Sequence, residues 1–133
     1  MNDALFGSKL TAALRRLLEI DQESVLAITD IAEERVRQID SEGWSPQHDD
    51  EHSDGEMADA AACYAVGSTM ENEVPRFWDG LPTRLKRRTT VWPWSPEWWK
   101  PKSPHHNKVR AAALLVAELA RIQRRATRAA GGA

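Results

Sequence analysis

Histidine and carboxylate side chains are concentrated in one short stretch of the chain, residues 48–56. The stretch reads HDDEHSDGE, so two imidazoles and five carboxylates fall within nine positions. Imidazole nitrogens with carboxylate oxygens suit Mn²⁺, Zn²⁺ or Fe²⁺, and carboxylates alone suit Mg²⁺. The spacing fits no closed metal motif, so a second interpretation stays open, in which Asp54 and Glu56 cap a helix. His48 and Asp50 would then hold the loop by hydrogen bonds.

A second group of residues with chemical potential is the segment WPWSPEWWKP, residues 92–101. Tryptophan offers a large flat face and one N–H donor, and proline keeps such a segment extended at low entropic cost. With Lys100 and Lys102 beside them, the indoles could form a platform for a nucleobase or a cationic ring. Alternatively, they fill the core of a chain that has only two Phe and one Tyr. We expect most of them to pack in the core and one or two to line a site.

A single carboxylate, Glu118, lies in the otherwise apolar run LLVAELARI. A buried carboxylate needs a partner or a shifted pKa. We favour an arginine partner, for which the candidates are Arg35, Arg37 and Arg121. In the alternative, Glu118 reaches the acidic stretch as a ligand for a metal or for a ribose hydroxyl. The full set of candidate metal ligands is His48, Asp49, Asp50, His52, Glu56 and Glu118.

Two helices are expected ahead of these groups. Leucines recur every three or four positions in residues 8–20, which predicts an amphipathic helix with Ser8 as its cap. A second helix ends at Gly43, which suits a left-handed C-cap, and Asp30 with Glu33 fits a capping box that would start or restart it. The apolar residues that share one face of this second helix are Ile28, Ala32, Val36 and Ile39.

Two further helices follow the acidic stretch. Residues 44–53 lack an apolar period and contain Pro46, so we expect a loop there. Residues 55–66 then form a third helix, whose alanines would let a neighbouring helix approach closely. The last helix opens at Ser103 and Pro104, since proline suits the first helical turn. Its core, VRAAALLVAELARI, is apolar on nearly all sides, which predicts a central position.

We therefore predict a single all-α domain, an irregular helical bundle of about four helices with a long Trp/Pro-rich loop. Residues 67–102 hold most of the prolines and tryptophans and show no lasting periodicity. A connection of this length in a compact domain is often functional. The expected parts are an N-terminal helical extension (1–29), a core (30–122) that includes the connection (67–102), and a basic frayed tail (123–133).

The net charge of −2 hides a strong asymmetry along the chain. Residues 1–75 hold 5 Lys/Arg against 17 Asp/Glu, whereas residues 76–133 hold 13 against 3. Such halves attract each other on folding, and adjacent copies could pair in the same way, so we expect a possible homo-oligomer. The slightly acidic total argues against general nucleic-acid binding. The basic run LKRRTT and the tail are then solvated arms by default.

The expected cellular compartment is inferred from the cysteine content and from the absence of long apolar runs. Cys63 is the one cysteine, so no disulfide can form within the chain. The start, MNDALFGSKL, lacks the apolar stretch of a signal peptide, and no apolar run approaches ~20 residues. We expect a cytoplasmic protein that does not span a membrane.

Four sequence blocks together resemble a widespread family of small bacteriophage and prophage proteins without established activity. The blocks are ERVRQIDSEGWSPQHDDEHSDGE, AAACYA, WPWSPEWWKP and VRAAALLVAELAR. The match runs from about Glu34 to Arg121 and implies a phage accessory function in the host cell cytoplasm. A short part, RQIDSEGWSPQHDD, is also similar to the ryanodine-receptor repeat domain, a helical module associated with ligand binding.

The same layout is similar to all-α nucleotide pyrophosphohydrolases of the MazG-like kind. Those enzymes bind Mg²⁺ through an E-E-x-x-E helix and a later E-x-x-D helix. The corresponding stretches here are EMAD at residues 56–59 and ELAR at residues 118–121, so the second lacks its aspartate. The resemblance implies metal-dependent nucleotide hydrolysis as an alternative function, and the missing aspartate puts catalysis in doubt.

The leading hypothesis is a phage accessory protein that binds, and sequesters, a nucleotide-like anionic small molecule in counter-defence. Tryptophans would stack on the base, cations would hold the phosphates, and the acidic stretch would shape the polar end. The alternatives are the metal-dependent hydrolase, with Mn²⁺, Mg²⁺ or Zn²⁺, and an inhibitor of a host protein that uses the Trp/Pro surface. The candidate ligand-binding residues are Arg35, Arg37, Trp44, His48, Asp50, His52, Trp94, Trp98, Trp99 and Lys100.

Overall fold

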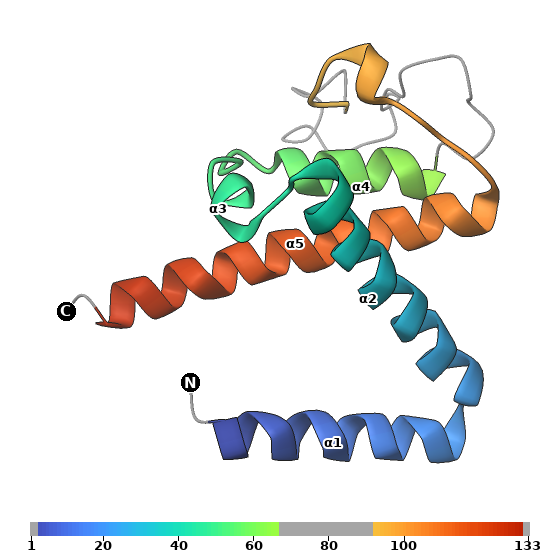
Figure 1. Cartoon of the computed structure of the whole chain (residues 1–133), viewed down its shortest axis with the longest axis vertical. Coiled ribbons are helices and arrows are strands. Elements are labelled where there is room, and N and C mark those ends of the chain that lie inside the picture. The colour runs from blue at the N-terminus through green and yellow to red at the C-terminus, as the bar shows by residue number, and fades with distance from the viewer. Residues whose placement is uncertain (1–2, 67–91, 132–133) are drawn as a thin grey trace, which may run out of the picture.

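The computed structural model describes residues 3–66 and 92–131, and all regular secondary structure within them is helical (Figure 1). The elements are α1 (Asp3–Ile20), α2 (Gln22–Glu42), α3 (Pro46–Asp49), α4 (Glu56–Val66), the 3-10 turn η1 (Pro96–Trp98) and α5 (Pro104–Gly131). The predicted all-α fold is confirmed. Residues 67–91 of the expected long connection lie outside the described residues. Among the helices that are described, none is both long and apolar enough to cross a membrane.

Local capping chemistry sets the helix ends. Asp21 accepts a hydrogen bond from the Ser24 backbone N–H at 3.2 Å and so caps the start of α2. Gly43 adopts φ 75° at the other end, the left-handed C-cap that the sequence predicts. Ser103 accepts a hydrogen bond from the His106 backbone N–H at 3.1 Å, so the predicted start of the last helix is confirmed too.

The hydrophobic core lies between α4, α5 and the tryptophan segment. Helices α4 and α5 lie side by side and run in opposite directions (Figure 1). Alanines on both helices allow this close approach, and two indoles cover the layer that results. The buried residues of this core are Ala60, Ala61, Cys63, Tyr64, Trp92, Trp99, Ala111 and Leu114. We call α4, α5 and residues 92–99 the core unit.

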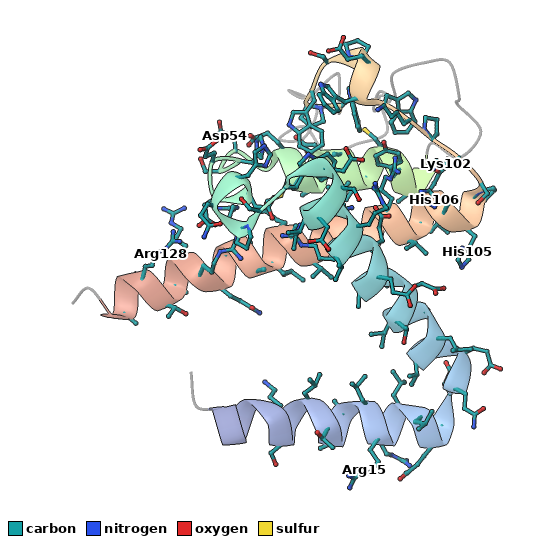
Figure 2. All side chains as sticks on the ribbon, in the orientation of Figure 1. Arg15, Asp54, Lys102, His105, His106 and Arg128 are labelled. Atoms are coloured by element: carbon teal, nitrogen blue, oxygen red, sulfur yellow. The ribbon has the colours of Figure 1, made fainter. Side chains whose placement is uncertain are left out.

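Helices α1 and α2 form an arm that is much less enclosed. Helix α2 crosses α5, whereas α1 contacts no described helix other than α2. Figure 1 shows α1 standing away from the core unit, and Figure 2 shows its side chains standing out along the helix. The arm therefore meets the core unit through α2.

Four boundaries differ from the sequence-based expectations. Helix α1 begins at Asp3 and passes through Gly7, and α2 is continuous past Asp30. The expected loop after Gly43 contains the short helix α3, capped where Ser45 accepts a hydrogen bond from the His48 N–H. Helix α5 continues to Gly131, so the tail that we expected to fray is helical. Its arginines explain part of this difference, because two of them bind the end of α3, as described below.

Candidate functional site

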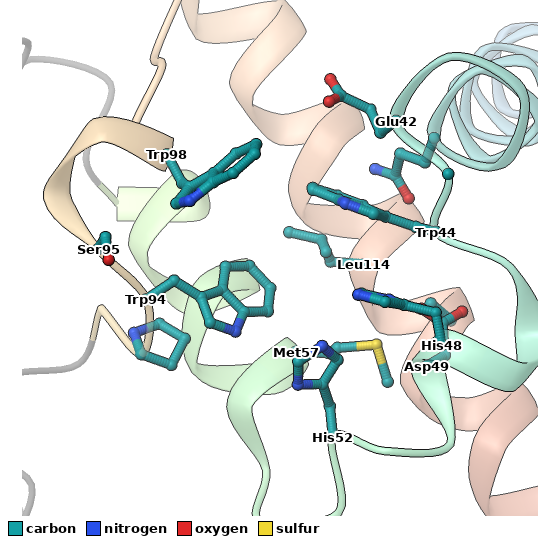
Figure 3. A pocket seen from close by; sticks show the side chains of 14 residues that line it. Glu42, Trp44, His48, Asp49, His52, Met57, Trp94, Ser95, Trp98 and Leu114 are labelled. Atoms are coloured by element: carbon teal, nitrogen blue, oxygen red, sulfur yellow. The ribbon is translucent and has the colours of Figure 1, made fainter.

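A cavity of about 590 Å³ opens where the C-terminal end of α2, helix α3, the tryptophan segment and α5 meet (Figure 3). Its base is apolar and is formed by Met57 of α4 with Leu114 and Ala117 of α5. Met57 and Leu114 are 2% and 1% exposed, so they are fixed by the core unit. The base of the cavity thus belongs to the enclosed core unit.

Three indoles form the aromatic walls of this cavity. Trp44 precedes α3, and Trp94 and Trp98 come from the segment around η1, far away in the sequence. The Trp44 and Trp94 ring centroids lie 6.0 Å apart with their planes tilted by 47°. Trp98 is 47% exposed, and Figure 3 shows it facing Trp44 across the cavity. A flat ligand can therefore meet an aromatic face on two sides.

The other indoles of the tryptophan segment serve the core. Trp92 and Trp99 are 5% and 8% exposed, and both pack against the Tyr64 ring, at centroid distances of 5.6 and 4.7 Å. Trp99, which we expected among the ligand-binding residues, does not line the cavity. The Tyr64 hydroxyl anchors this segment, since it accepts a hydrogen bond from the Lys100 backbone N–H at 3.2 Å.

Two histidines form the polar wall. The His48 and His52 rings meet edge to face with centroids 4.9 Å apart, and the His52 ring lies 5.6 Å from the Trp94 ring. His52 Nδ1 is 2.8 Å from a Glu56 carboxylate oxygen. Burial raises the pKa of Glu56, but hydrogen bonds from His52 and from the Asp54 backbone N–H outweigh it, so this pKa lies below its ordinary value.

Two carboxylates hold α3 in place beside the cavity through salt bridges to arginines. Asp49, 3% exposed, pairs with Arg35 of α2, which also donates to the Trp44 carbonyl oxygen at 3.2 Å. Burial raises the pKa of Asp49 above its ordinary value although Arg35 opposes the rise. Asp50 pairs with Arg124 at 2.8 Å and with Arg128 at 2.7 Å, and both arginines lower the pKa of Asp50.

A buried polar network lies behind the cavity wall, between α2 and α5. Glu34, 6% exposed, accepts hydrogen bonds from Arg37 at 2.7 and 2.9 Å and from Gln38 Nε2 at 3.1 Å. The Arg110 Nε of α5 lies 3.8 Å from the same carboxylate. Burial raises the pKa of Glu34, but the two arginines and Gln38 outweigh it and leave this pKa below its ordinary value.

Sequence reasoning missed Gln38, Tyr64 and Arg110 as parts of this region. Arg110 donates to the Tyr64 hydroxyl at 3.2 Å and to the Lys100 carbonyl oxygen at 3.1 Å, so it joins α5 to the tryptophan segment. Arg110 could have been noticed in the sequence, because it is a cation inside the apolar run VRAAALL. Gln38 offered no signal, because a single glutamine on a polar helix face has no distinctive pattern.

The structure does not assemble the predicted metal ligands. Within residues 3–66 and 92–131, no group of three or more His, Cys, Asp or Glu side chains is placed to hold a metal ion. Instead, Asp49 and Asp50 bind arginines, His52 pairs with Glu56, and Glu118 pairs with Arg121. The preferred interpretation of Glu118, an arginine partner, is confirmed for Arg121.

The predicted phosphate-binding cations are also engaged elsewhere. Arg35 pairs with Asp49, and Arg37 binds both Glu34 and Glu42. Among the described residues, the cavity lining carries carboxylates and imidazoles and includes neither Lys nor Arg. The exposed Lys100 lies close by, with its Nζ 5.5 Å from the centroid of the Trp98 ring. This arrangement can stack a flat, nitrogen-rich ring inside and meet an anionic group at the mouth.

Comparison of this chain with protein-family models, with curated proteins and with solved structures found no significant match. The cavity residues themselves therefore carry what can be inferred about function.

Proposed function

We propose that this protein binds a nucleotide-like small molecule through its base, in the Trp-lined cavity. One observation carries the proposal: Trp44, Trp94 and Trp98, from two distant stretches of the chain, border one cavity together with the histidine pair. Stacking of a base on an aromatic side chain contributes about 1 to 3 kcal/mol and suits any base. A pocket that is mostly apolar with a few polar groups is the usual form of a small-molecule site.

Two buried polar atoms support a ligand with a hydrogen-bonding edge. Gln38 Oε1 and His48 Nδ1 are buried and have no hydrogen-bond partner within the described part of the chain. The Gln38 amide is oriented by Glu34, because a carboxylate can only accept from the Nε2 group. The Oε1 atom is then left as an acceptor, which costs about 1 to 3 kcal/mol when it stays unmet. An N–H group on a base would recover that cost.

The phosphates of such a ligand would extend outward past Trp98 rather than inward. Arg35 and Arg37, which we first expected to hold phosphates, are neutralised by carboxylates, whereas Lys100 stands beside the exposed Trp98 ring. The site would thus recognise the base strongly and the phosphates weakly. Binding of this kind predicts that nucleosides bind nearly as tightly as their nucleotides.

We propose capture rather than turnover as the purpose of this binding. The pairing of Asp49, Asp50 and Glu118 with arginines supports capture, because those carboxylates are not free to hold an ion that activates water. The resemblance of the sequence blocks to small phage proteins motivates a role in counter-defence, with the captured molecule a nucleotide signal in the host cytoplasm.

The test is to incubate the pure protein with a panel of linear and cyclic nucleotides in Mn²⁺ and Mg²⁺, and then to separate free from heat-released nucleotides by chromatography. Capture predicts a nucleotide that is depleted from solution and recovered intact after heating. Trp98→Ala should weaken its binding about tenfold or more, while Trp98→Phe, which keeps a flat ring, should retain most of it. New products would instead support the hydrolase alternative, and a panel that comes through untouched would contradict the proposal.

A further inference from the structure

Helix α2 places its polar side inward and its apolar side outward. The buried residues of α2 are Glu34 and Gln38, at 6% and 0% exposure. Ile28 and Val36 lie on the opposite side and are 42% and 55% exposed, with the exposed Ala32 between them. The Glu34 network explains why the polar side is inside. Nothing within a single copy of the described chain explains the exposed apolar side, which normally faces a core.

Helix α5 carries a second exposed apolar stripe. Leu115, Leu119 and Ile122 are 46%, 57% and 49% exposed, and they follow one another at spacings of four and three. Ala112 and Ala126 extend the same spacing in both directions. Alternating spacings of three and four are the pattern of a helix that packs along another helix. We call these five positions the outer stripe of α5.

The two apolar surfaces carry opposite charges at their edges. Helix α2 has six carboxylates against two arginines, whereas α5 has six Lys and Arg residues against one Glu. Of these, Glu33 and Asp40 on α2 form no ion pair within the described residues, and Lys108 and Arg125 on α5 form none there either. A surface of α2 therefore complements a surface of α5, while α2 facing α2 would bring carboxylates together.

We propose that two copies of this chain associate, with the apolar side of α2 in one copy covering the outer stripe of α5 in the other, and the reverse. A contact made reciprocally closes at two copies, as a two-fold interface requires. It removes from water the apolar surface that a monomer rarely exposes. The contact lies on the outer sides of α2 and α5, away from the cavity, and does not depend on the proposed function.

The test is the oligomeric state of the full chain by sedimentation equilibrium over a range of concentrations. The wild type should form dimers, and Val36→Glu and Leu119→Glu should each weaken association by at least about tenfold, because each places a carboxylate in an apolar contact. Ala65→Glu, a matched change at an exposed position of α4, should leave association unchanged. Far-UV circular dichroism should show all three variants folded, since the altered side chains are exposed.

Mixing the two variants tests the reciprocal arrangement itself. In a mixed dimer of Val36→Glu and Leu119→Glu chains, one contact carries both changes and the other is wild type on both sides. The mixture should therefore associate more tightly than either variant alone. A wild type that stays monomeric at its highest soluble concentration would overturn the proposal. So would dissociation by Val36→Glu without any effect of Leu119→Glu, since that result indicates α2 pairing with α2.

Discussion

The core unit and the arm both contain large apolar residues, but the core unit buries them and the arm exposes them. In the core unit, Leu114 and Tyr64 are nearly inaccessible, and Trp92 and Trp99 close over them. In the arm, large apolar residues such as Leu18 and Val36 are at least half exposed, and a charged residue, Glu34, is buried in their place. Apolar packing thus holds one region together, whereas a polar network attaches the other region to it.

The difference teaches that amphipathic spacing identifies a helix but does not identify its inner side. A buried carboxylate with two arginines and an amide around it can draw the polar side inward. The apolar side of the helix then faces outward, where it can pack against another surface. The core unit therefore provides the base of a small-molecule site, and the outer side of the arm fits a contact with another chain.

The largest expected effect is the protection of the Cys63 thiol in the core unit. Cys63 is 1% exposed, and burial raises its pKa to about 12, so little thiolate exists at neutral pH. Alkylation of the folded protein should be slower than that of the unfolded chain by about 1000-fold or more, as expected when reaction requires opening of the core. Thiol labelling followed by mass spectrometry measures the rate. Labelling as fast as in denaturant would mean that the core unit is not closed.

Truncating a core indole should be the most damaging single substitution among the tryptophans. Trp92→Ala removes a ring that is 5% exposed and should lower the free energy of unfolding by about 3 to 5 kcal/mol. Trp98→Ala, at 47% exposure, should cost less than about 1 kcal/mol. Urea denaturation of both variants measures the difference. Equal losses would show that Trp98 belongs to the core rather than to the cavity mouth.

The attachment of the arm should depend on pH through Glu34. Folding lowers the pKa of Glu34, so the ionised carboxylate stabilises the fold above its ordinary pKa of 4.5, and this stabilisation is lost as the pH falls through the folded-state pKa. Glu34→Gln should therefore lower the free energy of unfolding by about 2 to 3 kcal/mol at neutral pH and by progressively less below 4.5. Denaturation curves at several pH values check this trend. A loss that is independent of pH would contradict the network.

The smallest expected effect comes from the outside of the arm. Leu18→Ala alters a residue of α1 that is 50% exposed, and it should change the free energy of unfolding by less than about 0.5 kcal/mol. Thermal unfolding at low protein concentration measures it. A loss comparable with that of a core leucine would show that α1 packs against something in solution, which would erase the contrast between the arm and the core unit.

Local chemistry made much of this fold predictable. Gly43, and Ser103 with Pro104, mark helix ends through capping that acts within a few residues, and alanine content allowed the close approach of α4 and α5. The pairing of Glu118 with Arg121 was predictable as well, because they lie three positions apart on one helix.

The arrangement of the site depended on contacts between distant segments, which spacing does not encode. Trp98 and Trp99 are neighbours, yet one lines the cavity and the other lies in the core, where it packs against Tyr64 and Trp92. In the same way, Arg35 could bind a phosphate only if α3 did not place Asp49 against it, and the two residues do pair. The composition therefore predicted the kinds of groups at the site but not which of them would be free.

Native mass spectrometry tests most directly the central claim, that the cavity and the outer helix surfaces are separate sites with separate tasks. A single spectrum reports both the number of copies and any retained nucleotide. After incubation with the nucleotide panel, the wild type should appear as a dimer with ligand, Trp98→Ala as a dimer without ligand, and Val36→Glu as a monomer with ligand. A wild type that is monomeric and bare, or variants that lose both properties together, would contradict this account.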